Sequence, residues 1–243
     1  MGKVIAITSG KGGTGKSTFS IGLAMGFSKL SKKVLLIDLD EGLRCLDLIL
    51  GIDKELVFDL SDRLNGRNIS DAVYCSPFDE NISLIPAPVE PESINGKAFS
   101  ELIAKLVGDY DYIILDFPAG IDFELYKSLP KQTQIISVCC PDPVSVRDAA
   151  VVCNRLPAMN KPPVFVINRF VYEDIRTGYF RNIDDIIDQS GFRLLGIVPE
   201  SEELTFLSVN HKLKRKGRAL NAFSRISNRL CGEHIRLPKP KKI

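Results

Sequence analysis

Short apolar runs separated by amphipathic stretches recur along the whole chain. Nearly continuous apolar runs predict buried strands, here at residues 3–8, 34–37, 81–86, 112–116, 133–140, 163–167 and 194–200, the last running into a loop. Apolar residues at helical spacing predict helices at 18–30, 95–107, 183–190 and 218–231, and short helices and loops at 52–75. Strands alternating with helices predict an α/β fold, with a mostly parallel central sheet flanked by helices.

A glycine-rich stretch joins the first predicted strand to the first predicted helix. It reads Gly10-x-x-x-x-Gly15-Lys16-Ser17, which matches the P-loop consensus in the strand–loop–helix context that the motif requires. Glycines let backbone N–H groups turn toward phosphate oxygens, and the helix N-terminus adds its positive dipole end. A glycine-rich turn also occurs without nucleotide, but the complete consensus favours a phosphate site. The predicted phosphate-binding residues are Gly10, Lys11, Gly12, Gly13, Thr14, Gly15, Lys16, Ser17 and Thr18.

Acidic residues end two of the predicted strands. Asp38 and Asp40 flank one residue, so on an extended backbone both point to the same side. Asp116 ends the strand at 112–116, which is the Walker B pattern. Carboxylates beside a Mg²⁺–triphosphate support the metal and orient an attacking water. We therefore predict that Ser17, Asp38 and Asp116 form the metal site, with a capped strand-to-helix turn as the alternative for the Asp38/Asp40 pair.

Lys11, a second lysine near the start of the loop, gives the chain its resemblance to a known family. This lysine is a signature of the MinD/ParA family of deviant Walker A P-loop ATPases, and the chain resembles the MinD branch most. Residues 38–47 are similar to that branch's switch I, and residues 116–120 are similar to its switch II. The resemblance spans nearly the whole chain and implies a three-layer P-loop NTPase fold.

The resemblance also implies how the site works. In the family, the lysine at the position of Lys11 reaches across a dimer interface to the partner's ATP, whereas the alternative here is a solvated surface lysine. Asp40 is implied to position the hydrolytic water, and Gly120 to offer a backbone N–H to the γ-phosphate. The implied catalytic residues are Lys11, Lys16 and Asp40, acting on ATP with Mg²⁺.

A second group of residues resembles the family's adenine site. Asn168 and Arg169 follow the strand at 163–167, and in the family such a pair contacts adenine, with the asparagine reading the base edge. Pro199 and Glu200 lie in a stretch similar to the second adenine-side loop. An ordinary strand-end turn is the alternative for the Asn168–Arg169 pair.

Three details qualify the match. MinD proteins commonly have Asn where this chain has Cys45, and relatives often have a small or polar residue where it has Phe117. Ser145 and Asp148 lie in a stretch similar to the family's and have the spacing of a helix-capping box. We expect them to cap the helix, with Asp148 at a dimer or regulator surface as the alternative.

Composition supports a soluble globular protein. At 243 residues, 44% hydrophobic and 26% charged, the chain is long enough for one large α/β domain. We identify no apolar run of transmembrane length and no signal peptide, and expect a cytoplasmic location. The six cysteines lack zinc-like spacing and are expected to be small reduced residues. We predict an ATPase domain at 1–232 and a basic tail rich in Pro and Lys at 233–243.

The net charge of +2 hides an asymmetry. Residues 211–243 hold eleven Lys or Arg and one acidic residue, a formal charge of +10, which leaves −8 for the rest. The helix at 218–231 has one apolar face and an arginine-bearing back; it is expected to pack on the core, with contact to acidic lipid as the alternative. Pro238 and Pro240 disfavour a helix in the tail. A solvated tail, an anionic membrane surface and non-specific DNA are the possible environments of this end.

These observations support a MinD-like function. We expect an ATP-dependent homodimer that dissociates on hydrolysis, turns over slowly without an activating partner protein, and helps to place the division site, peripheral to the inner face of the cell membrane. A ParA-type DNA-segregation ATPase and a MinD-like regulator of flagellar or polar assembly are the alternatives. A metabolic P-loop synthetase is disfavoured because the sequence shows no second substrate site.

Overall fold

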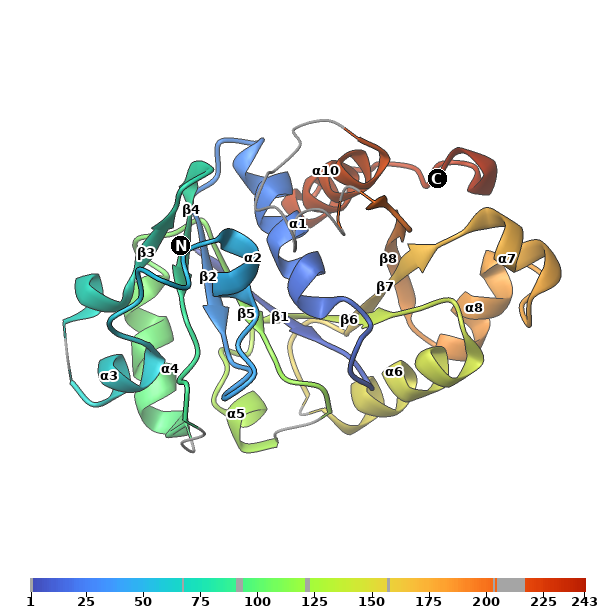
Figure 1. Ribbon diagram of the computed structural model, residues 1–243. Coiled ribbons are helices and arrows are strands. Elements are labelled where there is room, and N and C mark those ends of the chain that lie inside the picture. Colours follow the sequence, from blue (N-terminus) through green and yellow to red (C-terminus); the bar gives the residue numbers. More distant parts are fainter. Residues whose placement is uncertain are drawn as a thin grey trace.

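One eight-stranded sheet forms the middle of the protein in the computed structural model (Figure 1). The structure describes residues 2–66, 68–90, 94–120, 123–156, 158–202, 204 and 217–243. The strands are β1 Lys3–Thr8, β2 Val34–Asp38, β3 Tyr74–Ser76, β4 Asp79–Ile85, β5 Tyr112–Asp116, β6 Gln134–Cys139, β7 Val164–Phe170 and β8 Arg193–Pro199. Their spatial order is β3-β4-β2-β5-β1-β6-β7-β8, and every neighbouring pair is parallel except β3–β4. The predicted fold class is therefore confirmed.

Helices cover both faces of the sheet. They are α1 Lys16–Ser28, α2 Leu46–Leu50, α3 Leu60–Leu64, α4 Gly96–Leu106, α5 Phe123–Lys127, α6 Pro143–Arg155, α7 Tyr172–Thr177, α8 Ile183–Ser190 and α10 Arg218–Cys231, with 3₁₀ turns at Ile69–Ala72 and Pro240–Lys242. One core packs α1, α2 and α10 against the sheet, while two further clusters pack α3, α4 and α5, and α6, α7 and α8, against its other side. Because both faces are covered, the inner strands are buried throughout, as their continuous apolar sequences predict.

The helix α10 confirms the expectation of a core-packing helix. Its bounds match the predicted range, and Leu220, Phe223 and Ile226 are buried. Phe223 packs against α1, where its ring lies 5.6 Å from that of Phe19. A side chain at Gly22 would place its Cβ 2.2 Å from the Phe223 ring, so this close approach of two helices requires glycine.

Several short elements were not predicted individually. β3 pairs antiparallel with β4, within the region expected to hold only short helices and loops. On β3, the Tyr74 hydroxyl accepts hydrogen bonds from the backbone N–H groups of Val57 and Phe58 at 2.9 Å, which ties this hairpin to the preceding loop. α5 and α7 are also additional, at five and six residues.

The predicted capping box of α6 is wrong. The helix begins at Pro143, and its N-cap is Asp142, whose carboxylate accepts from the Ser145 backbone N–H at 2.9 Å. Asp148 lies inside the helix and pairs with Arg147 instead. An aspartate before a proline at the first helical position is a strong N-terminal signal, and it prevails over the Ser145 spacing.

The C-terminal end contacts the body of the protein, although most of residues 233–243 are exposed. A 3₁₀ turn forms at Pro240–Lys242, Lys241 lies over the Tyr172 ring at 6.0 Å, and Ile243 is buried in the α6/α7/α8 cluster. The basic run at 211–216 lies outside the described residues. Within the described part of the chain, no helix has the length and apolar character needed to cross a bilayer.

Candidate functional site

The glycine-rich loop connects the central strand β1 to α1. Gly13 and Gly15 have φ of 76° and 85°, in the left-handed region that favours glycine, and α1 begins directly after Gly15. The Ser9 hydroxyl donates to the Lys11 carbonyl at 2.7 Å, and the Gly120 N–H donates to the Ser9 carbonyl at 3.2 Å. The loop that follows β5 is therefore fastened to the P-loop by the same Gly120 N–H that was expected to reach the γ-phosphate.

Two carboxylates lie side by side next to this loop. β2 and β5 are neighbours, and their register pairs Asp38 with Asp116, both of which are 1% exposed. Burial is the main cause that raises the pKa of each, to about 6 for Asp38 and about 7 for Asp116. The charge of Asp38 adds to the shift at Asp116. Ionising both carboxyls is therefore costly at this buried position.

The first turns of α1 supply the partners of Asp116. The Ser20 hydroxyl donates to its carboxylate at 3.0 Å, and the neighbouring Ser17 hydroxyl and the charge of Lys16 lower its pKa. Lys16 itself is 8% exposed. The structure therefore brings together Lys16, Ser17 and Asp116, three residues that the motif assigned to phosphate and metal. Ser20 was not predicted.

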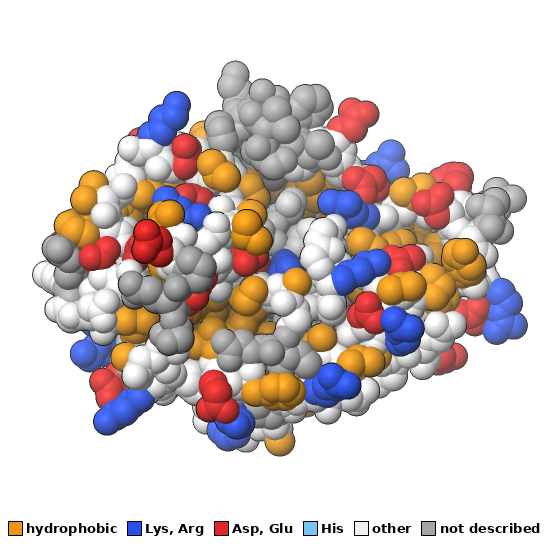
Figure 2. Space-filling model, turned by 60° about the horizontal axis from the view of Figure 1, so that its bottom comes forward, with side chains coloured by type: hydrophobic (Ala, Val, Ile, Leu, Met, Phe, Trp, Pro, Cys, Tyr) orange, Lys and Arg blue, Asp and Glu red, His pale blue; other side chains and the backbone are white. Residues whose placement is uncertain are grey.

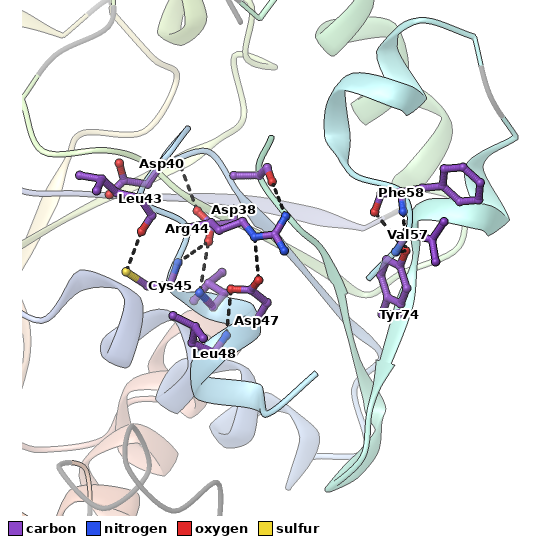
Figure 3. A network of polar contacts seen from close by, with 12 residues as sticks. Asp38, Asp40, Leu43, Arg44, Cys45, Asp47, Leu48, Val57, Phe58 and Tyr74 are labelled. Atoms are coloured by element: carbon purple, nitrogen blue, oxygen red, sulfur yellow. Dashed lines mark hydrogen bonds and ion pairs between the residues drawn. The ribbon is translucent and has the colours of Figure 1, made fainter. Parts of the chain in front are cut away.

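Asp38 organises the loop after β2 (Figure 3). Its carboxylate accepts from the backbone N–H groups of Asp40 at 3.0 Å, Cys45 at 3.1 Å and Leu46 at 3.2 Å, and so caps α2. These hydrogen bonds lower the pKa of Asp38 and oppose the larger effect of burial. The alternative explanation of a capped turn is therefore correct for Asp38. Asp40 is half-buried and lies at the start of this loop.

An ion pair also braces this loop. Arg44 contacts the buried carboxylate of Asp47 at 2.7 Å and also donates to the Ala87 carbonyl at 3.4 Å (Figure 3). At position 45, where relatives commonly have Asn, the Cys45 thiol contacts the Leu43 carbonyl at 3.0 Å. At position 117, where relatives often have a small or polar residue, Phe117 is buried and stacks on Tyr126 with ring centroids 4.1 Å apart. Phe117 is thus accommodated by the core rather than by the site.

The residues expected on the adenine side gather around one cavity of about 130 Å³. Its lining includes Gly15, Thr18, Asn168, Arg169, Pro199, Glu200, Ser201 and Leu204. Asn168 is 5% exposed, and its Nδ2 donates to the Thr14 carbonyl at 2.8 Å, which joins the end of β7 to the P-loop. A Cβ at Gly15 would lie 2.5 Å from that Nδ2. The contact explains why this glycine is required.

Lys11 has a partner within its own chain. Its ammonium lies 3.3 Å from the Asp142 carboxylate at the start of α6, and both side chains are 40% exposed. Asp142 was not among the predicted site residues, although an aspartate before proline was the signal that could have found it. Lys11 is therefore neither a free surface lysine nor placed over the P-loop in this single chain.

The side of the molecule that carries the P-loop also exposes apolar residues. Leu43 is 74% and Val89 63% exposed, and the Gly42 N–H bonds to the Pro88 carbonyl at 3.1 Å, which brings their two loops together. Val144, the second residue of α6 and two residues after Asp142, is 50% exposed. Figure 2, which turns the lower side of Figure 1 forward, shows hydrophobic side chains interspersed with charged ones over this face.

Comparison with known proteins gives consistent results. Residues 5–214 match the model of the CobQ/CobB/MinD/ParA nucleotide binding domain. The septum site-determining protein MinD of Bacillus subtilis is 34% identical over 98% of this chain and 92% of its own length. A solved MinC:MinD cell division protein complex of Aquifex aeolicus contains a chain 32% identical, with a TM-score of 0.84 over 98% of this chain and 99% of that one. MinD of Pyrococcus horikoshii complexed with Mg-ADP is 27% identical, with a TM-score of 0.79 over 95% and 96%.

Proposed function

Because the chain belongs to the CobQ/CobB/MinD/ParA family of nucleotide-binding domains, we propose that it is a MinD-like ATPase that acts as a dimerising spatial switch in placing the division site. Its relatives support a cell-division ATPase of the MinD kind. The observation that carries the proposal is the meeting of the P-loop, Asp38 and Asp116 at adjacent strand ends. The Lys11 signature is the reason for proposing a dimer.

The residues of the site fit a nucleotide with Mg²⁺. Two buried carboxylates with raised pKa values, supported by the Ser17 hydroxyl, form the oxygen-rich donor set that Mg²⁺ prefers. A Cβ at Gly12 or Gly13 would meet nothing within 4 Å, so the loop has open space above it. Family membership and the Mg-ADP complex of the Pyrococcus horikoshii protein support the same ligands here.

Positioning and charge neutralisation account for the catalysis that we propose. The bound metal would neutralise charge on the phosphates, and Ser17, Asp38 and Asp116 would hold it. Lys16 would stabilise negative charge at the β/γ-phosphates, and the Gly120 N–H would leave the Ser9 carbonyl to donate to the γ-phosphate. Asp40, beside this group on the loop after β2, would orient the attacking water.

The base-side cavity would hold adenine. Asn168 is fixed by its bond to Thr14, and its Oδ1 would be left to accept from the base edge. Arg169, Pro199 and Glu200 would form the walls of the same site. Because Asn168 also contacts the P-loop backbone, a shift of this side chain on base binding would also move the loop that holds the phosphates.

Dimerisation would complete the site. Lys11 would leave Asp142 and reach the phosphates in the opposite subunit, which the half-exposed position of the pair permits. The exposed apolar residues Leu43, Val89 and Val144 would become buried between the two copies. Hydrolysis would remove the γ-phosphate and dissolve the dimer.

We further propose a regulatory protein partner and an anionic membrane surface as the switch's targets. The Aquifex aeolicus MinC:MinD complex supports a protein partner. The excess positive charge of residues 211–243 supports an anionic surface. Activation of slow turnover by a partner belongs to the same proposal, and ParA-type DNA binding is its alternative.

Light scattering after size exclusion tests the switch. With ATP and Mg²⁺, Asp40→Ala should accumulate as a dimer, whereas Lys11→Ala should remain a monomer and still bind ADP. Lys131→Ala, which removes an exposed lysine elsewhere, is the charge control. If Lys11→Ala dimerises like the unmodified chain, the role proposed for Lys11 is wrong.

The location of the Asp40→Ala protein in cells tests the process. A membrane or division-site pattern supports the proposed function. A nucleoid pattern would instead support the DNA-segregation alternative, and a pole-restricted pattern the flagellar or polar one.

A further inference from the structure

Three arginine side chains meet at the end of the sheet that lies away from the P-loop. Arg193 is the first residue of β8, whose last residue, Pro199, lines the base-side cavity. At about 3.3 Å per residue, the two ends of this strand are about 20 Å apart. Arg225 and Arg229 are four residues apart on α10, so they share one face of that helix.

The strand and the helix present these side chains to one another. Arg193 is paired with Val164 of the parallel neighbour β7 and so shares its side of the sheet, and Val164 is buried in the same core as Phe223 of α10. A guanidinium nitrogen of Arg229 donates to the Leu195 carbonyl, and its Nε donates to the Ile235 carbonyl at 2.8 Å. Arg229 is therefore fixed in place by the backbone.

The cluster has more positive charge than its surroundings balance. Burial, and then the charges of Arg225 and Arg193, lower the pKa of Arg229. The remaining guanidinium nitrogen of Arg229 is buried without an acceptor. Across the described segments of the chain, none of the three has a carboxylate within ion-pair distance, in contrast to Arg44 and Arg181.

We propose that Arg193, Arg225 and Arg229 form a binding site for a phosphate monoester group. Planar guanidinium groups bind phosphate oxygens in pairs of hydrogen bonds. A dianion matches three cations better than a carboxylate with one charge does. Arg193 is exposed and Arg225 half-exposed, so both can change rotamer and admit an oxygen to the unpaired nitrogen of Arg229.

This site is independent of the proposed nucleotide switch, because it lies at the opposite end of the strands. The phosphate can come from a soluble phosphate or from a phosphorylated lipid headgroup. The adjoining segment favours the headgroup: after Ile235, which Arg229 holds, Arg236 is exposed and Leu237 is 41% exposed. An apolar side chain among cations suits the interface of an anionic bilayer.

Calorimetric titration of the full chain with inorganic phosphate tests the site. ADP and Mg²⁺ are added in one series to fill the P-loop and omitted in another, so a failure of nucleotide binding is seen separately. The double variant Arg193→Gln/Arg225→Gln should bind phosphate about tenfold more weakly or worse. The control Arg155→Gln/Arg218→Gln removes two other exposed arginines and should stay within about twofold of the unmodified chain.

Sedimentation with vesicles distinguishes the sources of phosphate. Binding to phosphatidic acid vesicles that exceeds binding to phosphatidylserine vesicles, and that the cluster variant loses, supports a headgroup. Phosphate binding without vesicle binding supports a soluble ligand. The proposal is overturned if the cluster variant binds phosphate as the unmodified chain does. It is also overturned if these arginines affect only binding to duplex DNA, which would assign the surface to nucleic acid.

Discussion

Asp116→Asn should stabilise the metal-free protein at neutral pH while damaging its site. Asp116 is fully buried, and its pKa is raised from 3.8 to about 7, first by burial and then by the charge of Asp38. Its folded state therefore binds a proton more tightly than its unfolded state does. Asparagine has nearly the same shape and can still accept hydrogen bonds from Ser17 and Ser20, but it never becomes charged.

The sign of the pH dependence follows from this shift. Well below the ordinary pKa of 3.8 the carboxyl is protonated in both states, and its ionisation costs no stability. As the pH rises toward 7 the unfolded chain loses its proton first, so the free energy of unfolding falls through this window. The interval from 3.8 to about 7 corresponds to about 4 kcal/mol at about 1.4 kcal/mol per pKa unit. Weaker hydrogen bonds to the amide reduce the net gain from Asp116→Asn to about 2 kcal/mol at pH 8.

Urea unfolding at pH 5 and pH 8 with EDTA measures the effect. The variant should be more stable than the unmodified chain at pH 8, with a smaller difference at pH 5. The exposed Asp109→Asn is the matched control and should change neither value by more than about 0.5 kcal/mol. Added ADP and Mg²⁺ should reverse the order, because only the unmodified chain keeps every residue of the proposed metal site. A variant that is no more stable than the unmodified chain at pH 8 would refute the reasoning.

Three further predictions concern individual contacts. Asp142→Asn should change the free energy of unfolding by less than about 1 kcal/mol, because the half-exposed ion pair between Lys11 and Asp142 is weak. By freeing Lys11, it should lower the ATP concentration needed for dimerisation. Light-scattering titrations that show no change in that concentration would contradict this prediction. Asn168→Ala should weaken ADP binding about tenfold in calorimetry while the fold is retained, and unchanged affinity would remove this residue from the site. Gly22→Ala should cost more than about 2 kcal/mol in urea unfolding because its methyl would meet the Phe223 ring, and adding Phe223→Leu should recover part of that loss if the clash is the cause.

The elements that the sequence predicted best are those whose apolar pattern lies complete within one continuous stretch of residues. α10 has a complete apolar stripe over fourteen residues, and β5 is an unbroken apolar run, so each is visible in a single stretch of sequence. α5 and α7 have only five and six residues. Helices that short are unstable alone and exist because tertiary contacts hold them. Their absence from the prediction therefore has a physical cause.

The same distinction applies to the site. The P-loop could be predicted because its chemistry lies within consecutive residues. Lys11 and its partner Asp142 are 131 residues apart, and Asn168 and Thr14 are 154 apart. Only the strand order, which puts β6 beside β1 and β7 beside β6, brings these pairs together. The sequence marked Lys11, Asn168 and Thr14 individually, but not the contacts that they make.

Asp38 shows why two competing explanations of a motif need not exclude each other. Its two oxygens have about four acceptor positions, and the backbone N–H groups of Asp40, Cys45 and Leu46 occupy three, one on Oδ1 and two on Oδ2. The remaining position is on Oδ1, at the strand end whose register partner is Asp116. A carboxylate with one acceptor position left suits support of a hydrated metal through water better than direct ligation. The cap and the proposed metal role would therefore use different parts of one side chain, and the cap fixes the orientation on which the proposed metal role depends.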